Sequence, residues 1–139
     1  MQLIEITGRK RYYQLDVNEC QVLFDENAKF KQHTYPKPNE GYVATVMTIE
    51  GGLFTGVSYG SDTQTLTMHG EMTALAHAAI HGYTNIIAIS GPNCHICKQI
   101  IYESSLRSGI DIIVVTQANG SFIQTPISQL MPQPWPESV

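Results

Sequence analysis

The order of apolar and polar residues predicts an amphipathic helix near the start of the chain, followed by a hairpin of two strands. Apolar residues recur at helical spacing within residues 16–32, at Val17, Cys20, Leu23, Phe24 and Phe30. Residues 33–40 contain two prolines among polar neighbours, which indicates a loop. Residues 42–49 and 53–59 are expected to be strands, joined by a turn at residues 50–52 (EGG).

From residue 67 onward the pattern predicts strands and helices in alternation. Apolar residues at i, i+3, i+4, i+7 and i+8 predict a helix that ends at Gly82, with one apolar face made by Met72, Leu75, Ala76, Ala79 and Ile80. Residues 86–90 and 110–116 are typical of buried strands, and residues 94–108 predict a helix ended by Gly109. A strand, helix and strand with such apolar runs implies a parallel crossover in a sheet covered by helices. The predicted fold class is therefore α/β.

Length and composition suit one globular domain over residues 1–139. Hydrophobic residues make up 42% of the chain and charged residues 14%, an ordinary globular balance. The formal net charge is −4, and the densest basic run, Gly8-Arg9-Lys10-Arg11, is interpreted as a solvated turn. Proteins that bind a nucleic-acid backbone usually show a basic surface, so no nucleic-acid partner is predicted.

Candidate chemistry lies in His69-Gly70-Glu71 and Cys94-His95-Ile96-Cys97. One histidine and two cysteines supply three zinc ligands and leave the fourth tetrahedral position open, as in catalytic zinc sites. Glu71 is placed where a carboxylate can act on a water at the metal without being a ligand. The pattern matches the zinc deaminase signature, His-x-Glu followed by Pro-Cys-x-x-Cys, except that Asn93 separates Pro92 from the first cysteine.

Two other interpretations of the cysteine pair are weaker. Cys-x-x-Cys also occurs in structural zinc sites and in redox pairs. A structural site needs a fourth ligand, but Cys20 is far upstream and His95 would have to fold back on the cysteines that flank it. A redox pair would leave His69 and Glu71 without a role. The joint pattern favours a catalytic Zn²⁺.

The predicted helices bring these residues together. His69 and Glu71 fall in the first turn of one helix, and Cys94 and Cys97 fall in the first turn of the next. Positions i and i+3 share a helical face, so both sulfur atoms can reach one metal. Helix N-termini carry partial positive charge and free N–H groups, which are expected to favour thiolates.

Cysteine use and hydropathy indicate a cytoplasmic protein with no membrane contact. Cys20 has no partner once Cys94 and Cys97 are assigned to a metal, which is typical of a reducing compartment. Residues 1–6 lack the layout of a signal peptide, and no apolar run approaches the ~20 residues needed to span a bilayer.

The sequence resembles the cytidine deaminase family, of the small homotetrameric kind, and also blasticidin S deaminase. The family's FTGCNVENASYGLTICAE lies without gaps on residues 54–71 (FTGVSYGSDTQTLTMHGE). Its CGACRQ lies on residues 94–99 (CHICKQ), and its C-terminal LLP-x-x-aromatic lies on residues 130–135 (LMPQPW). The resemblance implies a three-layer α/β/α domain with a five-stranded mixed sheet, a bound zinc and a homo-oligomer, tetramer or dimer.

By the same resemblance, the chain deaminates cytidine, deoxycytidine or a related cytosine nucleoside by hydrolysis. His69, Cys94 and Cys97 then stand at the ligand positions and Glu71 at the proton shuttle, which transfers a proton to ring N3 and assists the departure of ammonia. A carboxylate acting in this way is a general acid–base catalyst.

The chain departs from the family where the family binds ribose. The family's asparagine and glutamate at this place are Ser58 and Gly60 here, so a serine hydroxyl remains and a second polar side chain is lost. This keeps open a modified aminated nucleoside or base as substrate, as for blasticidin S deaminase. Tyr42 is the aromatic nearest to the family's phenylalanine before the first core strand, and it is predicted to contact substrate.

Residues outside the motif have two interpretations each. Trp135 is either a surface aromatic between prolines or the aromatic that, in the tetrameric enzymes, stacks on the base in a neighbouring subunit. His77 and His81 are expected at the surface or an interface. Lys98 either approaches a thiolate or is exposed to solvent.

Three hypotheses on function follow from the sequence. The leading one is an aminohydrolase of a small nucleoside. The second is a nucleic-acid editing deaminase, which the acidic balance disfavours. The third is a non-catalytic zinc module, which the altered Ser58 and Gly60 favour and the intact Glu71 disfavours.

Overall fold

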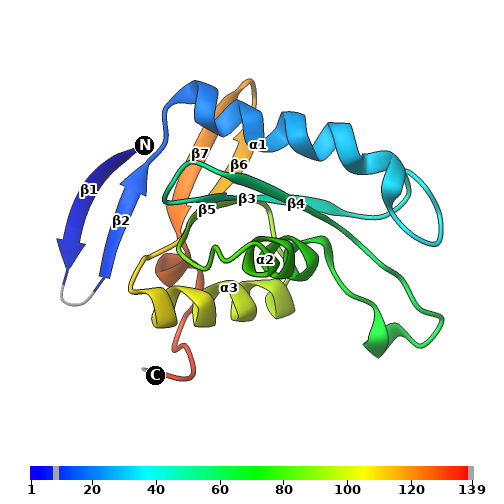
Figure 1. The fold of residues 1–139 in the computed structure, drawn as a ribbon. Coiled ribbons are helices and arrows are strands. Elements are labelled where there is room, and N and C mark those ends of the chain that lie inside the picture. Colours follow the sequence, from blue (N-terminus) through cyan, green and yellow to red (C-terminus); the bar gives the residue numbers. More distant parts are fainter. Residues whose placement is uncertain (8–9, 138–139) are drawn as a thin grey trace.

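A computed structural model describes residues 1–7 and 10–137, and in it three layers are stacked. Helix α1 covers one face of a mixed sheet, and helices α2 and α3 cover the other (Figure 1). The elements are β1 (Gln2–Thr7), β2 (Lys10–Gln14), α1 (Val17–Phe30), η1 (Lys31–His33), β3 (Val43–Thr48), β4 (Leu53–Val57), η2 (Gln64–Leu66), α2 (Gly70–Ile80), β5 (Ile86–Ser90), α3 (His95–Ser108), β6 (Ile113–Ala118), β7 (Ser121–Pro126) and η3 (Ile127–Leu130).

The main sheet has five strands among the described residues, in the order β4-β3-β5-β6-β7. Strands β5 and β6 are parallel, and the other neighbouring pairs are antiparallel. Helix α3 joins β5 to β6, so this unit is the parallel crossover predicted from the apolar runs. The prediction of an α/β/α domain with a mixed five-stranded sheet is confirmed.

Alternation along residues 112–115, at the start of β6, explains why this segment is apolar at every position. Ile112 and Val114 belong to the core under α2 and α3, whereas Ile113 and Val115 belong to the core under α1. Both faces of the sheet are covered, so no position of this segment is free for a polar side chain.

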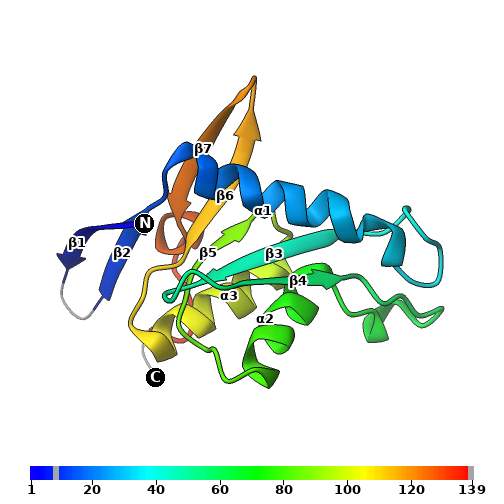
Figure 2. The ribbon, with the colours of Figure 1, turned by 45° about the horizontal axis from the view of Figure 1, so that its top comes forward.

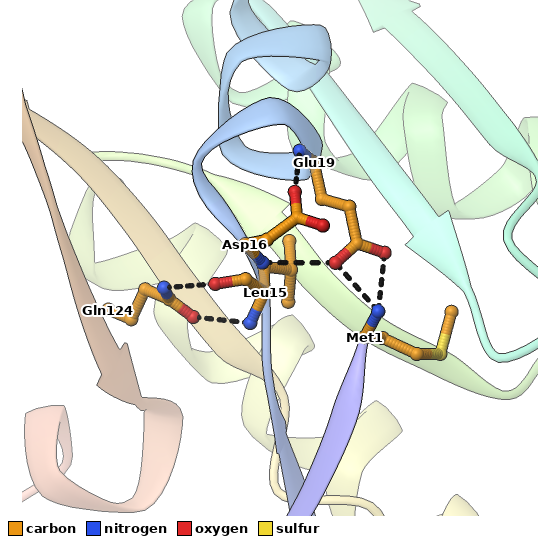
Figure 3. A network of polar contacts seen from close by, with 5 residues as sticks. All are labelled: Met1, Leu15, Asp16, Glu19 and Gln124. Carbon is orange, nitrogen blue, oxygen red and sulfur yellow. Dashed lines mark hydrogen bonds and ion pairs between the residues drawn. The ribbon is translucent and has the colours of Figure 1, made fainter.

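The start of α1 is fixed by a capping box and by two hydrogen bonds from a side chain of β7 (Figure 3). The Asp16 carboxylate accepts from the Glu19 backbone N–H at 2.8 Å, and the Glu19 carboxylate accepts from the Asp16 N–H at 3.0 Å, which makes a capping box. The Met1 amine also donates to Glu19 at 2.7 Å. The Gln124 amide pairs with both backbone groups of Leu15 at 2.8 Å, which joins β7 to the chain before α1.

Two strand pairings at the edges were not predicted. Strands β1 and β2 form a separate hairpin beside the main sheet (Figure 1), and a bridge between Arg11 and Ile110 ties it to the chain before β6. Strand β7 completes the main sheet, and the β6–β7 hairpin projects past α1 (Figure 2). These strands expose apolar side chains such as Leu3 and Ile123, which weakens any alternating pattern. The basic run predicted as a turn includes Gly8 and Arg9, which lie outside the described residues.

The predicted apolar face of α2 is wrong. The helix buries Gly70, Glu71, Ala74 and Ala78 against the sheet, and Ile80 from the predicted face is 83% exposed. The reason is the close approach of α2 to β4, which admits only small side chains between them: a Cβ added to Gly56 would lie 2.0 Å from the Ala74 backbone nitrogen. Contact between backbones therefore decides the orientation of α2. Met72 and Leu75 remain half-buried, and Ile80 is exposed.

The other predicted elements occur within a few residues of their expected bounds. Gly109 caps α3 with φ 73°, a left-handed conformation that glycine adopts without strain. Over the residues that the structure describes, no helix has both the length and the apolar character required to cross a bilayer.

Candidate metal and active site

The N-terminal ends of α2 and α3 place three metal-ligand side chains together. His69 is the N-cap residue of α2 and Cys94 is the N-cap residue of α3, while Cys97 lies in the first turn of α3. The His69 Nδ1 atom is 3.4 Å from the Cys94 Sγ and 3.2 Å from the Cys97 Sγ. All three donor atoms lie within 4.8 Å of one another, as predicted from the motif spacing.

This donor set fits a zinc ion. Zn–N bonds near 2.0–2.1 Å and Zn–S bonds near 2.3 Å place tetrahedral donors about 3.5 Å apart, close to the separations seen here. Within the described ranges, no further histidine, cysteine or acidic side chain joins the group. Cys20 lies in the core on the opposite face of the sheet, and His95 is exposed. A tetrahedral zinc held by these three side chains would have one position left for water or substrate.

The expectation that the helix end favours thiolates does not hold for Cys97. Burial raises the pKa of the Cys97 thiol well above its ordinary value, and the negative charge of Glu71 and the hydrogen bond with Cys94 raise it further. The sulfur is buried and an acidic side chain lies beside it, so the partial charge of the helix end is outweighed. A cation that binds here must displace a proton from this sulfur.

Glu71 lies beside the ligands without joining them. It is 8% exposed, and its Oε2 accepts a hydrogen bond from the Asn93 Nδ2 at 2.9 Å. The backbone of the preceding residue, Gly70, packs against β3 and β4, because a Cβ there would lie 2.9 Å from the Tyr42 carbonyl oxygen. The first turn of α2 is thus pressed onto the sheet, which fixes the position of this carboxylate.

A cavity of about 570 Å³ opens beside these groups. His69, Glu71 and Cys94 line one part of it, and residues 90–93 continue this wall. Residues 42–43, Ser58, Gln64 and Thr67 complete the lining. The volume lies in the range of sites for small organic ligands. The arrangement combines a metal-ligand group, a carboxylate that is not a ligand and room for a substrate the size of a nucleoside.

Solved structures of cytidine deaminases share this architecture. The enzyme of Burkholderia pseudomallei matches with a TM-score of 0.68 at 22% identity, over 83% of this chain and 98% of that one. The enzyme of Mycobacterium leprae matches with a TM-score of 0.68 at 20% identity, over 85% and 100%. The enzyme of Bacillus anthracis matches with a TM-score of 0.60 at 16% identity, over 84% and 89%.

The chain has the cytidine deaminase fold. No protein-family model matches the sequence, and no curated protein matches it at a significant level. The likeness to these enzymes is therefore a likeness of fold.

Within the cytidine deaminase fold, the two positions predicted for ribose contacts differ in their surroundings. Ser58 is buried and lines the cavity, where its hydroxyl oxygen accepts from the Tyr42 backbone N–H at 3.0 Å. Its hydroxyl proton remains available to a ligand. Gly60 does not line the cavity, and a Cβ there would lie 3.0 Å from Pro36.

The two predicted aromatic contacts are both exposed. Tyr42 is 78% exposed and lines the cavity. Trp135 is also 78% exposed, and it lies outside the cavity of its own chain. Its backbone carbonyl accepts from Gln99 on α3 at 2.6 Å, which anchors the C-terminal segment there. Contact of Trp135 with a base thus requires the cavity of a second subunit.

Of the secondary candidates, the two histidines lie away from the ligands. His77 and His81 are exposed and pack against Phe54, and the His77 Nδ1 is 2.9 Å from the Thr55 carbonyl oxygen. Lys98 follows the second cysteine and is half-buried. The expectation of a surface position holds for both histidines.

Sequence reasoning missed several polar residues of the cavity, among them Gln64 and Asn93. Gln64 lies in η2 and Asn93 lies in the loop after β5. Asn93 carried a signal, because it interrupts the Pro-Cys of the deaminase signature. Gln64 carried none, since a glutamine in a polar segment is usual.

Proposed function

We propose that the protein is a zinc-dependent aminohydrolase that converts cytidine, deoxycytidine or a related cytosine nucleoside to the uracil product and ammonia. The observation that carries this proposal is that the metal-ligand group of His69, Cys94 and Cys97 lies beside a cavity. The buried carboxylate of Glu71 lines the same cavity, together with His69 and Cys94. Three ligands with an open position and an adjacent carboxylate are the parts that hydrolytic deamination of a base requires.

In the proposed reaction the zinc ligands hold the metal, and Glu71 moves the protons. When bound, zinc acts as a Lewis acid that lowers the pKa of water toward neutrality. Glu71 accepts the first proton that water loses and transfers it to the ring nitrogen next to the reacting carbon. It then accepts the second proton, from the hydroxyl that has added to this carbon, and transfers it to the departing amine. One water is consumed and one ammonia is released, so the carboxylate ends each turnover in its starting form. Such a shuttle typically contributes ~10²–10⁴-fold to the rate.

The polar lining supports a nucleoside as substrate. Ser58 and Gln64 place a hydroxyl and an amide on the cavity wall, and both groups can pair with sugar hydroxyls. Gly60 supplies nothing to the cavity, which favours a second candidate, a modified aminated nucleoside or base of the blasticidin S kind. The net charge of −4 gives no support to a nucleic-acid substrate.

We also propose that the protein is a cytoplasmic homo-oligomer, a tetramer or dimer, in which a second copy covers the outward face of α2 and α3. This face exposes Ile80, Ile96 and Ile100, at 83%, 62% and 38%. Exposed Trp135 lies on the segment anchored to α3, where a neighbouring subunit can receive it. Sedimentation velocity at micromolar concentration tests this, and a monomer would refute it.

The experiment that tests the activity is ammonia release by zinc-loaded protein. The panel comprises cytidine, deoxycytidine, cytosine, CMP, blasticidin S, and adenine and guanine compounds. We expect turnover of at least one cytosine compound. Glu71→Gln is expected to abolish turnover while zinc content and melting temperature stay at the wild-type values. Silence of the wild-type protein on the whole panel would overturn the proposal, and unfolding of Glu71→Gln would indicate a structural role.

A further inference from the structure

The carboxylate of Glu71 has a freedom that the packing of its backbone does not remove. The close contacts of Gly70 with β3 and β4 fix only the backbone at the start of α2. Beyond the backbone, the last rotatable bond of a glutamate, next to its carboxylate, has only a broad preference. A general acid–base catalyst must point an oxygen at the atoms that exchange the proton. A donor that holds the carboxylate from one side would supply this direction.

Asn93 supplies such a donor. Its Nδ2 donates to the Glu71 Oε2 at 2.9 Å and to the Ser90 carbonyl oxygen at 3.1 Å. One amide nitrogen thus joins the carboxylate to the end of β5. Glu71 and Asn93 are each 8% exposed, so water competes little for this contact. Hydrogen bonds to an ionised acceptor are shorter and stronger than those between neutral groups.

The amide of Asn93 is itself held in one orientation. If its oxygen and nitrogen exchanged places, the oxygen would face a carboxylate oxygen and a carbonyl oxygen, and both are acceptors. The other side of the amide is packed beside Gly91, where an added Cβ would lie 3.2 Å from the Asn93 Oδ1 and 2.5 Å from the Val114 Cγ1. The amide therefore lies between core packing and Glu71, with its nitrogen toward the carboxylate.

Stability alone gives little reason for an asparagine at this position. Its Oδ1 is buried without a hydrogen-bond partner among the described residues, which native structures rarely allow. An apolar side chain of similar size would leave no such oxygen unpaired, and departures of this kind are expected at functional sites. The zinc deaminase signature has a proline directly before the first cysteine, and proline has no N–H to donate. The donor at residue 93 is therefore a feature of this chain rather than of the signature.

The second acceptor of Asn93 is held from the far face of the sheet. Ser90 ends β5, and its Oγ accepts from the Asn27 Nδ2 and from the Thr45 backbone N–H, both at 3.0 Å. Asn27 lies on α1, and its Oδ1 accepts from the Thr45 hydroxyl at 2.7 Å. The amide of Asn93 therefore rests on a residue that β3 and α1 both hold, which makes it a fixed point for Glu71.

We propose that Asn93 is the positioning residue of the Glu71 carboxylate. Its Nδ2 holds Oε2 and thereby sets the direction in which the carboxylate takes up and releases protons. Asn93 acts through Glu71 rather than by contact with the substrate. This inference rests on the proposed function and deepens it, because it names the residue that prepares the carboxylate for proton transfer.

Asn93→Leu removes the donor at similar size. We expect kcat to fall about 10- to 100-fold, because a small misplacement of a reacting group is enough for such a loss. KM should stay within about threefold, since the interaction that is lost does not involve the substrate. Ammonia release from the best substrate of the panel gives both constants. The single-turnover rate of the zinc-loaded protein should fall with kcat, which assigns the loss to the chemical step.

Asn93→Asp is the second variant, because it keeps the shape of the side chain and replaces the donor by an acceptor. It sets a second carboxylate against Glu71, so kcat should fall at least as far as in Asn93→Leu, again with little change in KM. Zinc content and melting temperature are recorded for both variants.

Asn27→Leu is the matched control. It makes the same substitution at the other asparagine that bonds to Ser90, on the opposite face of the sheet and outside the lining of the cavity. It should lower the melting temperature, because Ser90 and Thr45 lose a partner, and leave kcat within about threefold of the wild-type value. A loss of kcat as large as that in Asn93→Leu would show that loosening around Ser90 is sufficient, and it would overturn the proposal.

The remaining outcomes separate this inference from the proposed function. Absence of ammonia release by wild-type protein rejects both. If the wild-type protein is active, a wild-type kcat in Asn93→Leu rejects the inference alone. A rise in KM without a loss of kcat also rejects it, because Asn93 would then bind the substrate. Loss of zinc or of folding in both Asn93 variants would show that the residue holds the fold rather than the carboxylate.

Discussion

Gly56 on β4 and Ala74 on α2 are packed backbone to backbone. A Cβ on Gly56 would lie 2.0 Å from the Ala74 nitrogen and 2.3 Å from the Gly70 carbonyl oxygen, which is closer than any real contact. The first turn of α2 also carries Glu71 and follows His69, so this packing determines where the ligand and the carboxylate lie. A structural contact on the sheet-facing side of α2 therefore supports the chemistry of the site.

Gly56→Ala is expected to destabilise the protein by about 1–3 kcal/mol, because an overpacked site forces backbone shifts. Displacement of α2 should also weaken zinc binding. Chemical denaturation and zinc content measure both effects. Gly52→Ala is the milder comparison beside the same strand, since the atom nearest to an added Cβ is a Thr48 side-chain oxygen at 3.2 Å rather than backbone at 2.0 Å. A Gly56→Ala protein with wild-type stability would contradict the packing described here.

After zinc removal, the unfolding free energy is expected to fall as the pH rises through the alkaline range. Burial above all raises the pKa of the Cys97 thiol in the folded chain above the ordinary value of 9.0. Above pH 9 the unfolded chain releases this proton and the folded chain retains it, so the unfolding free energy of metal-free protein falls as pH rises. Below pH 9 the stabilising contribution of the Cys97 thiol to the unfolding free energy is fully present. With zinc bound the sulfur is already a thiolate, and this dependence should disappear.

Denaturation of chelated and zinc-loaded protein between pH 7 and 10.5 checks the prediction. In metal-free Cys97→Ser, the unfolding free energy should fall less steeply with rising pH than in the metal-free wild-type protein. Cys20 is a second buried thiol whose pKa is raised, first by burial and then by Asp16 and Glu19, so the comparison is made in a Cys20→Ala background. Equal slopes in chelated Cys20→Ala and in Cys20→Ala/Cys97→Ser would show that Cys97 does not contribute.

The metal site could be predicted because each of its two short motifs lies at the start of a helix. His69 and Cys94 each precede a helix, and Cys97 lies one turn further, so the local helices almost determine the donor positions. The crossover of β5, α3 and β6 was predictable for a similar reason, since continuous apolar strands need cover on both faces.

The remaining features depend on contacts between distant segments. The orientation of α2 is decided by Gly56, which lies in another element and has no side chain to reveal its role. The periodicity of the larger apolar residues instead predicted a face that the fold leaves half-buried at Met72 and Leu75 and exposed at its other residues. The hydrogen bond between Asn93 and Glu71 joins residues 22 positions apart, and only the assembled loop shows it.

Gln64 is expected to contact the sugar of a nucleoside substrate. Its amide lines the cavity from η2, while Gly60 at the family's second ribose position does not. Gln64→Ala should raise KM for a nucleoside about 3- to 10-fold, as for the loss of one exposed hydrogen bond, and leave kcat nearly unchanged. The free base cytosine is the control, because it has no sugar that Gln64 could contact. An equal effect on nucleoside and base would assign Gln64 to another part of the ligand.

Trp135 is expected to act in the cavity of a neighbouring subunit. It is 78% exposed and lies outside its own cavity, while the segment that carries it is bonded to α3 through Gln99. Trp135→Ala should raise KM about tenfold through the loss of a stacking face, with little change in kcat. Ile123→Ala, at a half-exposed apolar residue on β7, controls for a general surface effect. Sedimentation velocity on both variants separates two cases. Loss of substrate affinity in an intact oligomer supports stacking across subunits, and dissociation to monomers would show that Trp135 serves assembly instead.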